Sequence, residues 1–196
     1  MPARVAVMIS GTGTLLQSLI DDPDREYEIV VVAADRAAEG LKRATAAGIP
    51  TVVVAPADHP DRAIWSGALA DEIAAYRPDW VVSAGFMRIL DSAFLDRFPQ
   101  RVVNSHPALL PAFPGAHAVR DALAYGVKVT GCTVHLVDVG VDTGPIIAQQ
   151  VVAVAPDDTE ATLHERIKHV EWRLLPEVMR LLVAQGCEVN GRKVEL

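Results

Sequence analysis

An amide and an imidazole lie two residues apart in the segment Val102–Pro107. In an extended chain, side chains at positions i and i+2 point to the same side, so Asn104 and His106 are expected to be neighbours. An amide donor beside a titratable imidazole can stabilise a developing oxyanion. The same two side chains could instead satisfy backbone groups at a turn. Three prolines within residues 107–114 are expected to stiffen the loop that follows.

A carboxylate that could act on this imidazole, Asp142, lies in the sequence Gly140–Pro145. Its small neighbours would let the loop fold over a sheet edge, although an ordinary turn aspartate has the same surroundings. If Asp142 approaches His106, the carboxylate favours the imidazolium and raises the pKa of the histidine. The pair would then be a proton donor near neutral pH.

A glycine-rich turn, Ser10-Gly11-Thr12-Gly13-Thr14, follows the first apolar run and precedes a helical pattern. Backbone amides in such a turn can hold a phosphate, and a tight strand-to-helix turn with Thr14 as N-cap is the alternative. The third glycine of a dinucleotide fingerprint would fall at Leu16, and the lysine of a P-loop is absent. At Gly11, a Cβ is expected to crowd a bound phosphate and to force unfavourable backbone angles.

The segment Ser83–Leu90 combines a glycine, an aromatic ring, a thioether and two aliphatic side chains. It could form the wall of a slot for a flat heteroaromatic ligand, or it could close the hydrophobic core. The histidines show no paired metal-ligand spacing, and neither Cys132 nor Cys187 has a His or Cys neighbour at such a spacing. We therefore expect no metal.

Composition excludes several classes of protein. The chain has 196 residues, of which 51% are hydrophobic and 22% charged, so it is too apolar to be a disordered acidic tail. Its net charge of −7 disfavours the non-specific phosphate contacts on which nucleic-acid binding depends. No signal peptide or membrane-spanning run is present, and two cysteines are too few for a disulfide framework. We expect a cytoplasmic protein without nucleic-acid or membrane partners.

Short β-branched runs alternate with longer segments of helical spacing, a pattern typical of a parallel sheet with crossover helices. The expected strands are residues 4–9, 29–34, 51–54, 80–84 and 101–104. The expected helices are residues 14–20, 39–47, 61–76 and 92–97. Two further extended runs, 127–137 and 145–154, are joined by a link too short for a crossover helix, so they should be antiparallel.

A long helix is expected near the C-terminus, after a capping-box pattern that begins at Asp157. Apolar residues recur at three- and four-residue steps through residues 163–181 and should bury one face. Pro176 is expected to kink this helix and Gly186 to end it, and residues 188–196 are expected to add a small hairpin. The elements predict an α/β fold: an open, mostly parallel, Rossmann-like sheet with flanking helices and an antiparallel C-terminal strand pair.

Four segments taken together resemble a known family: Ile9–Gly13, Gly85–Leu90, Asn104–Pro111 and Asp142–Pro145. In this order and near this spacing they resemble the formyltransferases that use 10-formyltetrahydrofolate. The Ser-Gly-x-Gly loop and the sequence Pro111–Gly115 are most similar to members whose acceptor is the amine of glycinamide ribonucleotide. The resemblance covers nearly the whole chain. It implies formyl transfer from the folate to that amine in de novo purine biosynthesis, with no covalent enzyme intermediate.

The resemblance also implies roles for individual residues. Asn104 and a protonated His106 would stabilise the oxyanion, while Asp142 would keep His106 charged and position a water that carries a proton to the leaving folate nitrogen. The implied substrate-binding residues are Gly11, Thr12, Gly13, Thr14 and Glu171. The implied folate-binding residues are Arg62, Met87, Arg88, Ile89, Leu90 and Asn104.

The family loop commonly continues Ser-Asn after Ser-Gly-x-Gly, whereas this chain has Thr14-Leu15, which removes a side-chain amide near the phosphate. This departure concerns substrate affinity rather than reaction type. We expect one formyltransferase domain over residues 1–196, with a phosphate-binding α/β half at 1–100 and a catalytic and folate-binding half at 101–196. The expected partners are small-molecule substrates, with 10-formyltetrahydrofolate as co-substrate, and a homodimer is compatible with the sequence.

Four other functions are weighed against this interpretation. Formyltetrahydrofolate hydrolases resemble this domain preceded by a small regulatory domain, and initiator-tRNA formylating enzymes resemble it followed by a nucleic-acid-binding domain; we expect neither extra domain here. A Rossmann-type oxidoreductase is disfavoured by the missing third glycine. A non-catalytic folate-binding module is disfavoured by the presence of Asn104, His106 and Asp142 together.

Overall fold

The computed structural model describes residues 1–196, and its chain divides into two compact units, Met1–Asn104 and Ser105–Leu196. The division falls inside one strand, slightly later than the boundary expected at residue 100. Below we call Met1–Asn104 unit 1 and Ser105–Leu196 unit 2. That the chain forms one formyltransferase domain stays a prediction.

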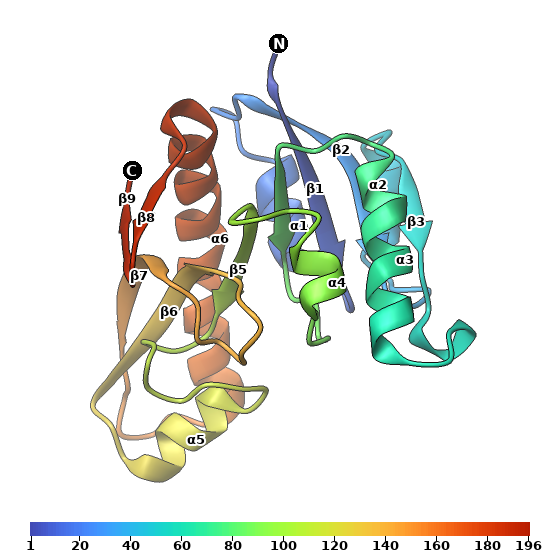
Figure 1. The fold of residues 1–196 in the computed structure, drawn as a ribbon. Helices are drawn as coiled ribbons and strands as arrows, with labels where there is room; N and C mark the ends of the chain where they lie inside the picture. The colour runs from blue at the N-terminus through green and yellow to red at the C-terminus, as the bar shows by residue number, and fades with distance from the viewer. The chain divides into compact units, whose positions relative to one another are not determined.

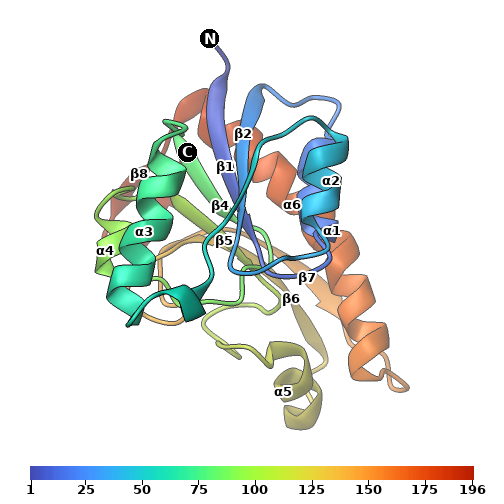
Figure 2. The same ribbon diagram turned by 90° about the vertical axis from the view of Figure 1, so that its right-hand side faces the viewer.

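Unit 1 is built on parallel strands in the order β3-β2-β1-β4-β5, with neighbouring strands paired in parallel register. The strands are β1 (Ala3–Ile9), β2 (Tyr27–Ala34), β3 (Thr51–Val53), β4 (Trp80–Ser83) and β5 (Val102–His106), whose last two residues belong to unit 2. The helices are α1 (Thr14–Ile20), α2 (Leu41–Ala46), the short 3-10 helix η1 (Pro56–Asp58), α3 (Arg62–Ala74) and α4 (Ser92–Leu95). Figure 2 shows α3 and α4 on one side of these strands and α1 and α2 on the other.

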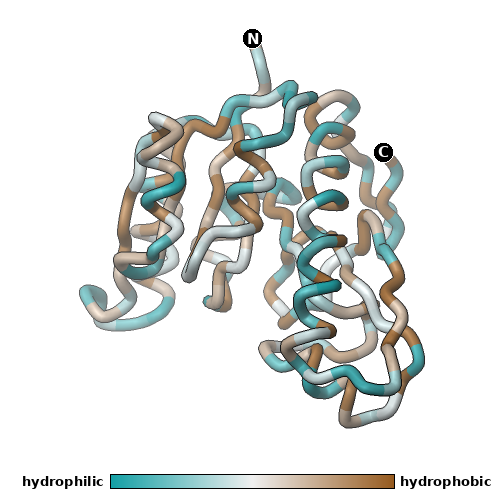
Figure 3. The backbone as a smooth tube through the Cα atoms, turned by 180° about the vertical axis from the view of Figure 1, so that it is seen from behind, coloured by the Kyte–Doolittle hydropathy of each residue, from teal (hydrophilic) through white to brown (hydrophobic).

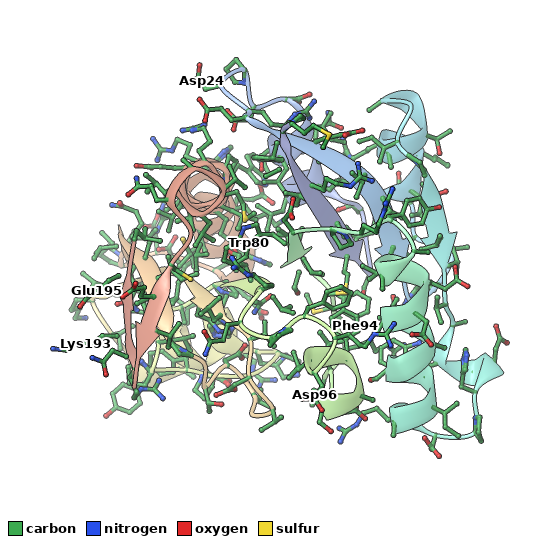
Figure 4. All side chains as sticks on the ribbon, turned by 45° about the horizontal axis from the view of Figure 1, so that its top comes forward. Asp24, Trp80, Phe94, Asp96, Lys193 and Glu195 are labelled. Carbon is green, nitrogen blue, oxygen red and sulfur yellow. The ribbon has the colours of Figure 1, made fainter.

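The central strands of unit 1 are largely apolar because helices cover both faces of the sheet. Residues Val5–Ile9 of β1 are fully buried, and the strand segments of unit 1 are mostly brown in the hydropathy colouring of Figure 3. Trp80 on β4 and Phe94 on α4, both labelled in Figure 4, are also buried. Since the strands are parallel, the segments that leave β1, β2 and β4 all start at one edge of the sheet, where ligands of open α/β sheets bind.

Unit 2 combines a long antiparallel strand pair with the longest helix of the chain (Figure 1). Its elements are α5 (Ala118–Tyr125), β6 (Val129–Leu136), β7 (Ile146–Ala153), α6 (Glu160–Gln185), β8 (Glu188–Asn190) and β9 (Lys193–Glu195). Strand β9 pairs in parallel with β7 and in antiparallel with β8. One face of α6 packs on the sheet through Leu163 and Ile167, which bury against Cys132 and Val152.

Most expected elements are present, with ends shifted by a few residues. The fold class is the predicted one: a mostly parallel sheet with flanking helices and the antiparallel pair β6–β7. The C-terminal hairpin is confirmed, and Lys193 and Glu195 on its β9 strand are exposed (Figure 4). Gly186 ends α6 as expected, with a positive φ of 73°.

One expectation about α6 is corrected. The cap of α6 is Thr159, whose hydroxyl accepts from the Thr162 amide while the Thr162 hydroxyl accepts from the Thr159 amide, so the capping box is not at Asp157. Pro176 lies inside α6, and the kink expected there stays a prediction. Helix α5 was not predicted, because small residues such as Ala118 and Ala122 form its buried face and give a weak apolar signal.

No helix of this structure has the length and apolar character needed to span a bilayer.

Candidate active site

Strand β5 carries the amide and imidazole that the sequence places two residues apart. Asn104 is half-buried and lies opposite Ser83 in the parallel register of β4 and β5. His106 ends the strand and is only 4% exposed. The alternation of a strand turns both side chains to the same side, as expected, and turns Ser105 to the other.

Asp142 lies beside His106 in unit 2, which confirms the expected approach of the loop. Its Oδ2 atom is 3.3 Å from Nδ1 of His106, and its Oδ1 atom is 3.7 Å from Nε2 of His135, on β6. The Asp142 side chain is 14% exposed, so the two imidazoles share a carboxylate that is largely shielded from water. Its φ of 53° puts the residue in the left-handed region, which aspartate tolerates better than most residues.

The loop between β5 and α5 supplies further contacts to the pair. The Phe113 carbonyl lies 2.8 Å from Nε2 of His106, and the Gly115 amide donates to Oδ2 of Asp142 at 2.7 Å. Both Phe113 and Gly115 have positive φ values, 54° and 91°. The Leu110–Pro111 peptide bond is cis. The Leu110 amide donates to Thr133 Oγ1, so the loop is anchored on β6.

Both ring nitrogens of His106 therefore face an acceptor. Nδ1 faces the Asp142 carboxylate and Nε2 faces the Phe113 carbonyl. Only the doubly protonated imidazolium can donate to both, because a neutral imidazole has a single N–H. The hydrogen-bonding geometry thus favours the charged ring.

Burial acts against that charge and corrects one expectation. Burial lowers the pKa of His106 below its ordinary value, and this outweighs the opposite effects of the Asp142 carboxylate and the Phe113 carbonyl. The Asp142 carboxylate acts to raise the pKa of His106, as expected, but the expected net increase is wrong because the sequence does not reveal how much water the ring loses. Burial also acts to raise the pKa of Asp142, but its contacts with His135, the Gly115 amide and His106 hold it below the usual range.

The glycine-rich loop of unit 1 is fixed from the side of α2. The Gly40 amide donates to the Gly11 carbonyl at 2.9 Å, and Nε of Arg43 donates to the Thr12 carbonyl at 2.8 Å. In a trans peptide the N–H points opposite to the C=O. The amides of Thr12 and Gly13 therefore point away from α2 as two adjacent donors, while the carbonyls of Gly11 and Thr12 point toward it.

Two details of this loop differ from expectation. Gly13, with φ of 70°, is the N-cap of α1 and makes no side-chain cap, while Thr14 is already the first helical residue. Gly11 does not have a positive φ, and a Cβ built there would meet no atom within 4 Å. The conformational need for glycine is at Gly13, where a Cβ would lie 2.8 Å from Cα of Gly40.

The expected folate segment lines a cavity of about 500 Å³ in unit 1. Arg62, at the start of α3, lines the same cavity as Met87, Arg88 and Ile89, although it lies far from them in sequence. Met87 is 68% exposed and offers its thioether to a ligand. Leu90 is buried and does not line the cavity, so its side chain belongs to the core.

Glu171, on α6, is buried and accepts a hydrogen bond from the Ser105 hydroxyl at 2.6 Å. Burial raises the pKa of Glu171, and the Ser105 hydrogen bond acts in the opposite direction. Because Ser105 points to the side of β5 opposite His106, the Glu171 carboxylate lies across the strand from the imidazole. No group of three or more His, Cys, Asp or Glu side chains is arranged to hold a metal ion.

Comparisons with known proteins identify the family of the chain. A family model described as formyl transferase matches residues 3–179. The chain belongs to the formyl transferase family. A curated phosphoribosylglycinamide formyltransferase of Mycobacterium tuberculosis (strain H37Rv) is 55% identical to this formyltransferase over 193 residues, covering 97% of this chain and 90% of the relative.

A human relative and a solved crystal structure are also similar to this chain. The human trifunctional purine biosynthetic protein adenosine-3 is 44% identical over 196 residues, which cover 97% of this formyltransferase and 19% of that protein. The crystal structure of glycinamide ribonucleotide transformylase 1 from Symbiobacterium toebii superposes with a TM-score of 0.97 at 45% identity, covering 100% of this chain and 94% of that one.

Several residues with contacts described above give little signal in the sequence. His135 has no metal-ligand spacing, yet its imidazole lies beside Asp142; its place near the end of an expected strand is the available signal. Arg43 lies one turn into α2 and looks like any surface arginine in sequence. The contacts of Phe113 and Gly115 are made by backbone atoms, so no side-chain pattern could have revealed them.

Proposed function

We propose that this formyltransferase transfers the formyl group of 10-formyltetrahydrofolate to the amine of 5-phosphoribosylglycinamide, giving formylglycinamide ribonucleotide and tetrahydrofolate in purine biosynthesis. The observation that carries the proposal is the buried His106–Asp142 pair at the end of the strand that bears Asn104. The names of its relatives support the choice of acceptor.

In the proposed reaction the glycinamide nitrogen attacks the formyl carbon and forms a tetrahedral intermediate. The carbonyl oxygen becomes an oxyanion, which the Asn104 amide and the His106 imidazolium stabilise. The intermediate collapses when the bond between the formyl carbon and the folate N10 breaks. The attacking nitrogen loses one proton and N10 gains one, through a water that Asp142 positions, so protons balance and no covalent enzyme intermediate forms.

In this scheme Asp142 must counteract burial, which disfavours the imidazolium form of His106. Its carboxylate is the nearest negative charge to the ring, at 3.3 Å, and favours the charged form that the reaction requires. Nε2 of His106 faces the Phe113 carbonyl. To reach the oxyanion, this donor must exchange the Phe113 carbonyl for the substrate oxygen, and catalytic contacts commonly tighten only when substrate is bound.

The two substrates are proposed to bind as follows. The phosphate lies at the Gly11–Thr14 loop, where the amides of Thr12 and Gly13 are oriented by donors from Gly40 and Arg43. Glu171 contacts the ribose side of the ribotide. The pterin and its tail bind along Arg62, Met87, Arg88, Ile89, the backbone of Leu90 and Asn104, with the 500 Å³ cavity as the folate site. Both partners are small molecules.

A spectrophotometric assay tests the proposal. Purified protein is mixed with 10-formyltetrahydrofolate, with and without 5-phosphoribosylglycinamide, and loss of the formyl group from the folate is followed. We expect deformylation only with the ribotide, accompanied by an equal amount of formylated ribotide. Release of formate without ribotide would instead indicate a hydrolase, and no reaction in either mixture would contradict catalysis of this transfer.

A further inference from the structure

A buried carboxylate lies at the carboxyl end of β2, outside every motif considered above. Asp35 directly follows the strand and is 1% exposed. A carboxylate removed from water is costly unless it is paired and hydrogen-bonded. The partners that stabilise the buried Asp35 carboxylate at this ligand-binding edge therefore indicate its role.

Asp35 is held by two guanidinium groups. Nε of Arg88 donates to Oδ2 at 2.6 Å, while Arg36 donates through Nη2 to Oδ2 at 2.9 Å and through Nε to Oδ1 at 3.2 Å. Burial acts to raise the pKa of Asp35, but hydrogen bonds from Arg36, Arg88 and Ser10 hold it below its usual range. Two positive charges against one carboxylate leave a net positive charge at an edge that is proposed to bind anionic substrates.

The third partner of Asp35 links it to the phosphate loop. Ser10 hydrogen-bonds to Asp35, and its hydroxyl oxygen also accepts from the Met87 amide at 2.8 Å. The Ser10 amide donates to the Gly85 carbonyl at 3.2 Å. Ser10 begins the loop that is proposed to hold the phosphate, and Gly85 and Met87 begin the segment that is proposed to hold the folate.

Asp35 thus joins three segments that leave parallel strands: Ser10 after β1, itself after β2, and Arg88 after β4. An asparagine could not replace it. Both carboxylate oxygens accept from arginine, and an amide would present an NH₂ group to one of these donors. The cluster of Ser10, Asp35, Arg36 and Arg88 requires the charge as well as the shape.

We propose that Asp35 is a positioning residue that couples the two substrate sites of the proposed function. It holds Arg88 and Ser10 in one arrangement, so that ordering of the phosphate loop by the ribotide also orders the folate segment. Each substrate then raises the affinity for the other, and by thermodynamic linkage the factor is the same in both directions.

Binding of tetrahydrofolate, which carries no formyl group and cannot react, tests this inference. Its Kd is measured by calorimetry with and without saturating 5-phosphoribosylglycinamide, in the wild type and in Asp35→Asn. We expect the ribotide to tighten tetrahydrofolate binding to the wild type by about 5-fold or more, as is typical of coupled sites. In Asp35→Asn the factor falls to about 1.

Two further variants keep the test decisive. Asp71→Asn removes the partner of Arg97 in an exposed ion pair and is the matched control, for which we expect the wild-type factor. Ser10→Ala keeps the Asp35 charge but removes the hydroxyl between Asp35 and the Met87 amide, and we expect a reduced factor there even if Asp35→Asn does not fold.

The outcomes separate the hypotheses. A wild-type protein that binds both ligands without coupling overturns the inference alone. Coupling that persists in Asp35→Asn, with both affinities weakened equally, shows a merely structural role and also overturns it. A wild-type protein that binds neither ligand overturns the proposed function, and this inference with it.

Discussion

Replacing Asp142 by asparagine removes the negative charge that His106 and His135 share and keeps the shape of the side chain. Asparagine tolerates the left-handed backbone of this position, and its carbonyl oxygen can still accept from the Gly115 amide. The variant therefore removes the electrostatic effect of the carboxylate on both imidazoles and keeps the Gly115 contact. An alanine there would add a backbone cost and would leave the Gly115 donor without its partner.

The magnitude follows from the distance. Two unit charges 3.3 Å apart, as in His106 and Asp142, attract by about 5 kcal/mol at an effective dielectric constant of about 20. An amide that still accepts a hydrogen bond returns about 1 kcal/mol. Since general acid catalysis contributes about 10²- to 10⁴-fold, we expect Asp142→Asn to lower kcat by about 10²- to 10³-fold.

The assay is the ribotide-dependent deformylation described above, with kcat and KM determined for both substrates. The Kd of tetrahydrofolate should change by less than about 2-fold, because Asp142 has no part in the proposed folate site. The removal of the carboxylate lowers the pKa of His106 further, so the residual activity should rise toward acidic pH more than that of the wild type.

A control comes from the same loop. Asp138 accepts from the Thr143 hydroxyl and the Gly140 amide and contacts neither imidazole in the structure, so Asp138→Asn should retain kcat within about 3-fold. If Asp142→Asn also retained kcat within about 3-fold, the carboxylate would have no role in charging His106 and the proposed mechanism would be refuted.

Four other predictions concern binding and stability. The Cβ of Gly11→Val meets no atom within 4 Å, so the melting temperature should stay near the wild-type value while KM for the ribotide rises about 10-fold or more. Gly13→Ala should instead destabilise the fold by about 1–3 kcal/mol, because of its positive φ and the contact with Gly40. Glu171→Gln should raise the melting temperature clearly at pH 8 and much less at pH 5. Folding raises the pKa of Glu171, so the ionised carboxylate opposes folding at pH values above its ordinary pKa. An equal gain in melting temperature at both pH values would contradict this. Burial lowers the pKa of His106, so the neutral ring contributes to stability above the ordinary pKa of 6.5, and this contribution is lost as the pH falls below it. Between pH 7 and 5, the melting temperature of His106→Gln should therefore fall less than that of the wild type.

The fold was accessible from sequence because its signals are local. Uninterrupted apolar runs such as Ile29–Ala34 indicate strands buried on both faces, and the short link between β6 and β7 allows only an antiparallel pair. The N-terminus of α6 was placed less well. Asp157 and Thr159 are both good caps, and the choice depends on which backbone amide each side chain can reach.

The sequence indicates which residue types form the site but not the direction of their pKa shifts. The approach of Asp142 to His106 was anticipated, whereas the direction of the pKa shift depends on burial by segments that are distant in sequence. The role of Asp35 could not be anticipated either, since its partner Arg88 follows a different strand and the two meet only when the sheet is assembled. Long-range packing decides both.

The contact between Gly13 and Gly40 limits how this enzyme could be redesigned for another acceptor. A Cβ on either residue would lie 2.8 Å from Cα of the other, so the two backbones already stand as close as any pair of residues allows. No second substitution can relieve a side chain introduced at the first, because neither partner can become smaller than glycine. Directed evolution toward a different anionic acceptor must therefore leave this pair untouched and explore Gly11, where an added Cβ meets no atom within 4 Å.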